Sequence, residues 1–129
     1  MSDLSSPCGI WRITVRRLGP RRDPTTRLGV FVRIEADGTV RVLSGSSTAE
    51  PGFGGWRSAG PGRVVLVTES LVTGPAGSYR GRLSVQAAAE MTGDGRSCQV
   101  RLRWQRLDAD SRPLGGPVRA EGEGTRLAP

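Results

Sequence analysis

The chain has 129 residues, a formal net charge of +7, 19 glycines and two cysteines. At about 150 residues per domain, this length predicts a single domain over residues 1–129, with residues 1–8 as a flexible N-terminus. All 19 basic residues are arginine, and histidine is absent. The composition therefore excludes histidine-based nucleophilic sites, histidine-liganded metals and lysine Schiff-base enzymes.

The cysteines and the N-terminus give no sign of a metal site, a secretory signal or a membrane span. Cys8 and Cys98 lie too far apart in sequence for a metal-binding motif, and the carboxylates are scattered. The N-terminus has no basic segment followed by an apolar one, and no stretch approaches the roughly 18 apolar residues of a membrane helix. We expect a cytoplasmic protein with free thiols, without metal or cofactor, and without membrane contact.

Apolar and polar residues alternate along most of the chain, and Gly, Pro, Asp and Ser interrupt the alternation at regular intervals. This pattern predicts antiparallel strands joined by turns, and almost no helix. The predicted strands cover residues 10–17, 28–35, 39–45, 53–58, 63–72, 78–91, 97–107 and 116–127. We therefore predict an all-β fold, an eight-stranded antiparallel up-and-down β-barrel, because closure removes exposed sheet edges.

The connections alternate in length. Short glycine-bearing links at 36–38, 59–62 and 92–95 are typical of tight hairpins. The longer links are residues 18–27, 45–52, 73–77 and 108–115. Because alternate connections of a meander lie at opposite ends, we expect a tight end and a loop-rich end.

The alternation also assigns the two faces of the strands. Most arginines fall on the outward phase, where they aid solubility. The residues expected to point inward are Trp11, Ile13, Val15, Leu28, Val30, Val32, Ile34, Val40, Val42, Val65, Val67, Leu71, Leu83, Val85, Ala87, Ala89, Met91, Val100, Leu102, Trp104, Val118 and Ala120.

Two short motifs mark the ends of the predicted barrel. Gly9-Ile10-Trp11 matches the G-x-W of the first lipocalin strand, and Thr125-Arg126-Leu127 matches the last-strand arginine that packs over that tryptophan. Together with the eight strands, they resemble the calycins, which include lipocalins, fatty-acid-binding proteins and avidins. The resemblance implies a calycin-like barrel in which Trp11 and Arg126 form a structural contact at the tight end.

Other motifs are similar to those of small bacterial proteins of this kind. They are D-G-T-V at 37–40, P-G-x-G-x-W-R at 51–57 and the terminal G-T-R at 124–126. The chain lacks the long helix that follows the eighth strand of true lipocalins.

Several residues expected inside the barrel are small, namely Gly81, Ala87, Ala89, Ala120, Gly122 and Gly124. They leave two alternatives: a ligand cavity of roughly several hundred cubic ångströms, or a flattened barrel filled by Trp and Met side chains. In the first case the expected ligand-binding residues are Trp56, Leu71, Val85, Met91 and Trp104. The strand that carries Trp56 is short, so this indole can face either way.

Glu69 is the one carboxylate that the alternation places inside, between apolar neighbours. With Tyr79 and Arg106 it would form a catalytic group in the loop-rich half, in which Glu69 acts as a general base. The structural alternatives are a Glu69–Arg106 ion pair at the barrel mouth, or a bulge that turns Glu69 outward.

We therefore expect a protein that binds a small apolar molecule inside its barrel, in a bacterial biosynthetic or carrier role. The alternative is a cofactor-independent cyclase or isomerase acting on a polyketide-like substrate, as in bacterial cyclases that the chain resembles in fold only. Nucleic-acid binding is not favoured, because the outward arginines have no exposed aromatic partners.

An apolar patch on the outside predicts a homodimer. Phe31 and Leu43 are expected to face each other across two strands, with Val64 and Leu66 nearby. Monomers rarely expose large apolar patches, so this group indicates an interface that two-fold symmetry would make isologous. The alternative is a patch covered by the 45–52 loop.

Overall fold

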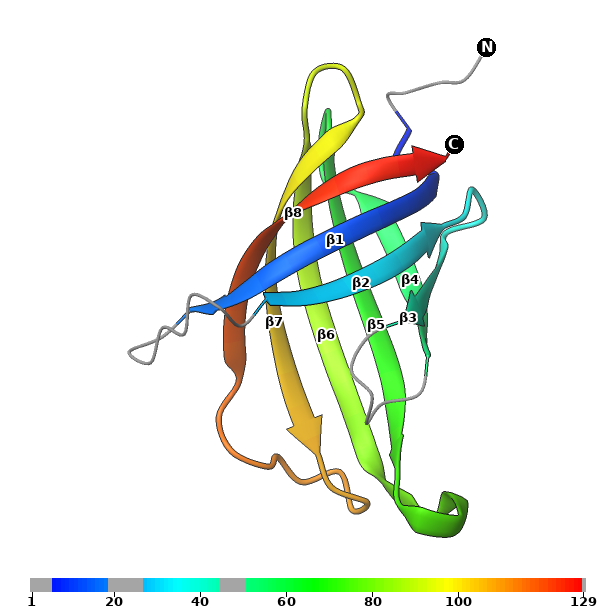
Figure 1. The fold of residues 1–129 in the computed structure, drawn as a ribbon, viewed down its shortest axis with the longest axis vertical. Helices are drawn as coiled ribbons and strands as arrows, with labels where there is room; N and C mark the ends of the chain where they lie inside the picture. The colour runs from blue at the N-terminus through cyan, green and yellow to red at the C-terminus, as the bar shows by residue number, and fades with distance from the viewer. Residues whose placement is uncertain (1–5, 19–26, 45–50, 129) are drawn as a thin grey trace.

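The protein is a closed barrel of eight antiparallel strands (Figure 1). A computed structural model describes residues 6–18, 27–44 and 51–128. Within them, each strand pairs with the next and β8 pairs with β1, which confirms the predicted up-and-down barrel. The elements are β1 Gly9–Leu18, β2 Arg27–Ile34, β3 Thr39–Ser44, β4 Gly52–Ser58, β5 Arg63–Thr73, the 3-10 turn η1 Pro75–Gly77, β6 Tyr79–Met91, β7 Ser97–Leu107 and β8 Val118–Ala128.

The predicted strand boundaries agree with the observed ones to within two residues. The short turns β2–β3, β4–β5 and β6–β7 lie at one end of the barrel with the start of β1, and η1 and the β7–β8 connection lie at the other (Figure 1). Parts of the other two long links, residues 19–26 and 45–50, lie outside the described residues. The described part of the chain contains no helix long and apolar enough to cross a membrane.

Two of the tight turns are closed by an aspartate. Asp37 accepts hydrogen bonds from the hydroxyl of Thr39 at 2.6 Å and from its amide at 3.0 Å. Asp94 accepts them from the hydroxyl of Thr92 at 2.6 Å and from the amide of Arg96 at 3.0 Å. The bond from each threonine hydroxyl is the main cause that lowers the pKa of the two carboxyls below their ordinary value. These bonds explain why D-G segments form turns here.

The expected phase of β5 is wrong. Val65, Val67, Glu69 and Leu71 were assigned to the interior, but Val67 is 49% and Leu71 54% exposed. The inward residues of β5 are Val64, Leu66, Thr68, Ser70 and Val72, which pair with the inward residues of β6. Both phases of this strand are largely apolar, so alternation alone does not choose between them. The outward phase keeps the charge of Glu69 in water, where it does not lose its hydration.

The observed phase of β5 also removes two of the four residues from the expected dimer patch. Val64 is buried and Leu66 packs against the core, so neither is on the outside. A register shift between Phe31 and Val32 places Phe31 opposite Ser44 instead of Leu43, although Phe31 and Leu43 are both exposed. The homodimer stays a prediction, and only Phe31 and Leu43 of the patch that motivated it lie on the outside.

The core lies toward the tight end of the barrel. Its buried members are Trp11, Val32, Ile34, Val40, Cys98 and Val100. Trp56 packs against this cluster, and its indole Nε1 donates a hydrogen bond to the Glu35 carbonyl at 2.7 Å. This bond ties β4 to the β2–β3 turn and settles the direction of Trp56, which faces inward.

Trp11 and Arg126 join the first and last strands. They are register partners between β1 and β8, and the Arg126 guanidinium carbon lies 4.7 Å from the centroid of the Trp11 ring. Trp11 is 2% exposed, and its Nε1 donates to the Pro7 carbonyl at 2.8 Å. This cation–π contact is the one that the calycin resemblance implies.

Arg126 also holds two other segments against the barrel end. Its Nε donates to the Gly95 carbonyl at 2.9 Å, its Nη1 to the Cys8 carbonyl at 2.7 Å and its Nη2 to the Ser6 carbonyl at 2.6 Å. Residues 6–8 were expected to belong to a flexible N-terminus, and these bonds attach them to β8. One guanidinium thus connects the N-terminal segment, the β6–β7 turn and the closing strand pair.

We expect Trp11→Ala to lower the free energy of unfolding by about 3–5 kcal/mol, because it removes the largest core side chain and the ring under Arg126. Chemical denaturation of the variant measures this change. Phe31→Ala, which truncates an aromatic side chain that is 41% exposed, is the control and should cost much less. A Trp11→Ala variant as stable as its parent would contradict the closed barrel.

Candidate functional site

The interior of the barrel contains a cavity of about 110 Å³ in its tight half. Trp11 and Pro7 bound it at the tight end, and the cross-strand pair Thr68 and Val85 bounds it toward the loop-rich end. Its other lining residues are Ile13, Val30, Val32, Ile34, Val42, Val64, Leu66, Ala87, Ala89, Met91, Cys98, Val100 and Leu102. The walls are therefore hydrocarbon and sulfur with a single hydroxyl residue.

The alanines of β6 make room for this cavity, and the glycines do not. Ala87 and Ala89 line it directly. A Cβ at Gly122 would collide with the backbone of Thr14 and Val15. One at Gly124 would meet the Cys98 sulfur at 2.5 Å, and one at Gly81 would collide with the Leu107 carbonyl oxygen. The space that the sequence predicted is therefore occupied by the backbone of a neighbouring strand or its end at Gly81 and Gly122, and by the Cys98 side chain at Gly124.

The cavity is smaller than the several hundred cubic ångströms expected, and the interior is not completely filled either. Met91 and Trp11 line the cavity and take up part of the barrel interior, which was the role of Trp and Met side chains in the alternative prediction of a filled barrel. A dry cavity of about 150 Å³ is known to admit benzene or xenon. At about 110 Å³, the site is suited to a guest with a handful of heavy atoms.

The lining offers almost no polar chemistry. It contains no charged side chain among the described residues, and its polar groups are the Thr68 hydroxyl and the Cys98 thiol. Burial raises the pKa of Cys98 from 9.0 to about 11, so this thiol stays protonated at neutral pH. Neither group provides a base or nucleophile that is active at neutral pH.

Of the five expected ligand-binding residues, two line the cavity and three do not. Val85 and Met91 line the cavity. Trp56 faces inward but packs beside the core without lining the cavity, and Trp104 is a half-buried residue opposite Val85. Leu71 points outward, so its assignment to the interior is wrong.

The expected catalytic group does not come together among the described contacts. Glu69 points outward with 54% of its side chain exposed, and its carboxylate lies 3.5 Å from Nε of Arg82. Tyr79 and Arg106 are exposed, and no described hydrogen bond or ion pair joins either of them to Glu69. The expectation of an inward Glu69 is wrong, because the phase of β5 places it outside. The surface ion pair with Arg82 replaces the expected partner Arg106.

A metal site has no support in the described part of the chain, where no three His, Cys, Asp or Glu side chains form a group that could hold an ion.

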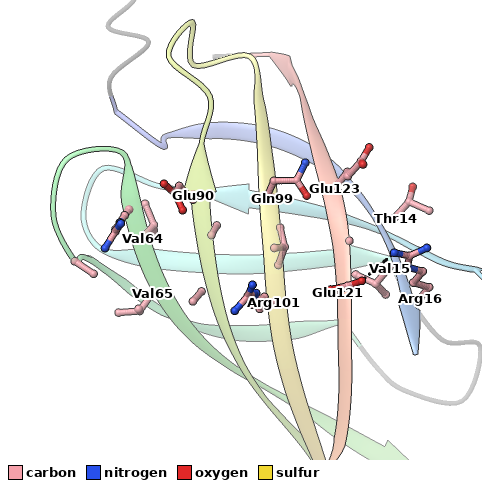
Figure 2. A pocket seen from close by; sticks show the side chains of 16 residues that line it. Thr14, Val15, Arg16, Val64, Val65, Glu90, Gln99, Arg101, Glu121 and Glu123 are labelled. Atoms are coloured by element: carbon pink, nitrogen blue, oxygen red, sulfur yellow. Dashed lines mark hydrogen bonds and ion pairs between the residues drawn. The ribbon is translucent and has the colours of Figure 1, made fainter. Parts of the chain in front are cut away.

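Larger hollows occur on the outside of the barrel. One of about 940 Å³ spans β5, β6, β7, β8 and β1, and Figure 2 shows Glu90, Gln99, Arg101, Glu121 and Glu123 along it. Its charged side chains have both signs, and Arg16 and Glu121 pair across it at 2.9 Å (Figure 2). These groups are exposed, so a surface hollow of this kind offers an apolar ligand less driving force than the apolar interior.

Comparison with known proteins adds no family assignment, since no protein-family model matches the chain and no curated protein shows significant similarity to it.

Sequence reasoning missed Thr68. This residue is 3% exposed and lines the cavity, whereas the phase predicted for β5, with Val67 and Glu69 inside, implies that it points outward. A signal was present, because Val64, Leu66 and Val72 share its phase and form an apolar set of their own.

We expect Cys98 to resist alkylation in the folded protein, because it is 4% exposed and its raised pKa keeps the reactive thiolate scarce. In a Cys8→Ser variant, mass spectrometry after iodoacetamide treatment at pH 8 should show slow labelling that accelerates toward pH 11. The raised pKa also means that the stability contributed by the protonated thiol is complete below pH 9.0 and declines as pH rises toward 11. Labelling at pH 8 as fast as in denaturant would show that Cys98 is accessible.

Proposed function

We propose that the protein binds a small, predominantly apolar molecule inside its barrel. The observation that carries this proposal is the cavity of about 110 Å³, whose described lining has no charged side chain. Transfer of apolar surface from water into such a site is favourable without any directional contact. Binding, rather than chemistry, is the activity that these walls support.

The free-energy cost of the empty volume supports the proposal. Interiors normally pack densely, and an unfilled cavity destabilises a fold by about 24 cal/mol per cubic ångström. At about 110 Å³ the empty site costs the protein about 2–3 kcal/mol. A guest that fills the space recovers dispersion contacts that the lining atoms otherwise lack.

The calycin relationship is part of the same proposal. A closed eight-stranded barrel, with Trp11 of β1 under Arg126 of β8, is compatible with a calycin-like protein. Binding in the barrel interior is the activity that this resemblance implies. Cys8 and Cys98 are both free, which fits a reducing compartment and supports the cytoplasm as the proposed location.

The cyclase alternative has no comparable support. It required Glu69 inside the barrel as a base, and this carboxylate lies on the outer surface beside Arg82.

Binding is tested by titrating the protein with cyclopentane and with benzene while methyl resonances are followed by NMR. We expect saturable shifts of the Val100 and Leu102 methyl groups, which line the cavity, and none for Val67, which is exposed on the outside. Shifts confined to outer methyl groups, or no saturation at all, would contradict the proposal.

A matched pair of variants on β6 provides the control. Ala87→Leu adds an isopropyl group inside the cavity and should abolish binding of both hydrocarbons. Ala88→Leu adds the same group to the exposed outer face and should leave binding unchanged. Ala89→Leu, from the other lining alanine, replaces Ala87→Leu if that variant does not fold. Equal binding by the Ala87 and Ala88 variants would place the hydrocarbons outside the cavity.

A further inference from the structure

We propose that the natural ligand carries one uncharged oxygen, a carbonyl or a hydroxyl, on a small hydrocarbon body, and that this oxygen binds the hydroxyl of Thr68. This inference rests on the proposed binding function and names the chemical class of the ligand. It follows from the position of a single polar group in an otherwise apolar cavity.

Thr68 is a buried residue whose hydroxyl has no partner in the described part of the chain. The residue is 3% exposed and lines the cavity. Its hydroxyl makes no hydrogen bond to a described residue. A buried hydroxyl without a partner destabilises the folded state, and a guest oxygen can remove that penalty.

The position of Thr68 orients the guest. Thr68 pairs with Val85 at the boundary nearest the loop-rich end, and Trp11 closes the opposite boundary. The next inward residue on β5 beyond Thr68 is Ser70, which is also buried. The hydrocarbon body therefore lies toward Trp11 and the oxygen toward the loop-rich end.

The same walls exclude ionised ligands. A buried charge needs a partner of opposite sign, and the described lining has none. The guanidinium of Arg126 is bonded to the carbonyls of Gly95, Cys8 and Ser6, and among the lining residues it lies over the Trp11 ring and contacts the sulfur of Met91 at 3.7 Å. Carboxylates and amines of the same size should therefore bind poorly.

The experiment compares three probes of equal carbon skeleton, cyclopentane, cyclopentanone and cyclopentanol, in the parent and in Thr68→Val. Valine keeps the shape of threonine and replaces the hydroxyl with a methyl group. We expect Thr68→Val to weaken binding of cyclopentanone or cyclopentanol about 2- to 10-fold, since one neutral hydrogen bond is lost. Binding of cyclopentane should stay unchanged or tighten. Whether the ketone or the alcohol loses more identifies the class of oxygen.

Thr14→Val, which makes the same change on the exposed outer face of β1, is the control and should alter none of the three affinities. Thermal denaturation provides a readout that needs no ligand. Thr68→Val should be as stable as the parent or more stable, because it removes a buried hydroxyl that has no partner. A clear loss of stability would show that the protein satisfies this hydroxyl, and would overturn the inference.

The outcomes separate the two proposals. If cyclopentane binds but Thr68→Val changes no relative affinity, the ligand class is wrong and the binding function stands. If no probe binds the parent, the binding function fails and the inference fails with it.

Discussion

Among the eight strands of the ring, β1 and β8 come from opposite ends of the chain, and Arg126 over Trp11 is the side-chain contact that joins them at the tight end. The guanidinium is planar and carries several donors, so it can stack on the indole and bond three backbone carbonyls at once. Because the Trp11 ring also bounds the cavity, the same contact takes part in closing the barrel and in forming the site.

The strands and turns could be predicted because their causes are local. Period-two alternation, D-G turns and glycine-bearing links act within a few residues, and Asp37 and Asp94 close their turns with bonds to near neighbours. The G-x-W and T-R-L motifs placed Trp11 and Arg126 together across the closure, which the structure confirms.

The candidate site was harder to predict, because its determinants are not local. Both phases of β5 are apolar, and the choice depends on its neighbours across the sheet. Ser70 fills the space beside Gly52, where a Cβ would lie 2.5 Å from its hydroxyl oxygen, and Thr68 pairs with Val85 of β6. Glycines create a second ambiguity. Gly122 marks a close approach of β8 to β1, whereas Ala87 marks empty space, and composition alone does not distinguish these two causes of a small residue.

The central proposal is that a dry binding site lies between Trp11 and Thr68. Diffraction from crystals of the protein under xenon pressure tests this most directly, since xenon occupies apolar cavities and scatters strongly. We expect a xenon peak inside the barrel, in contact with Ala87, Val100 and Leu102. An interior without xenon, or one filled by ordered water, would contradict it.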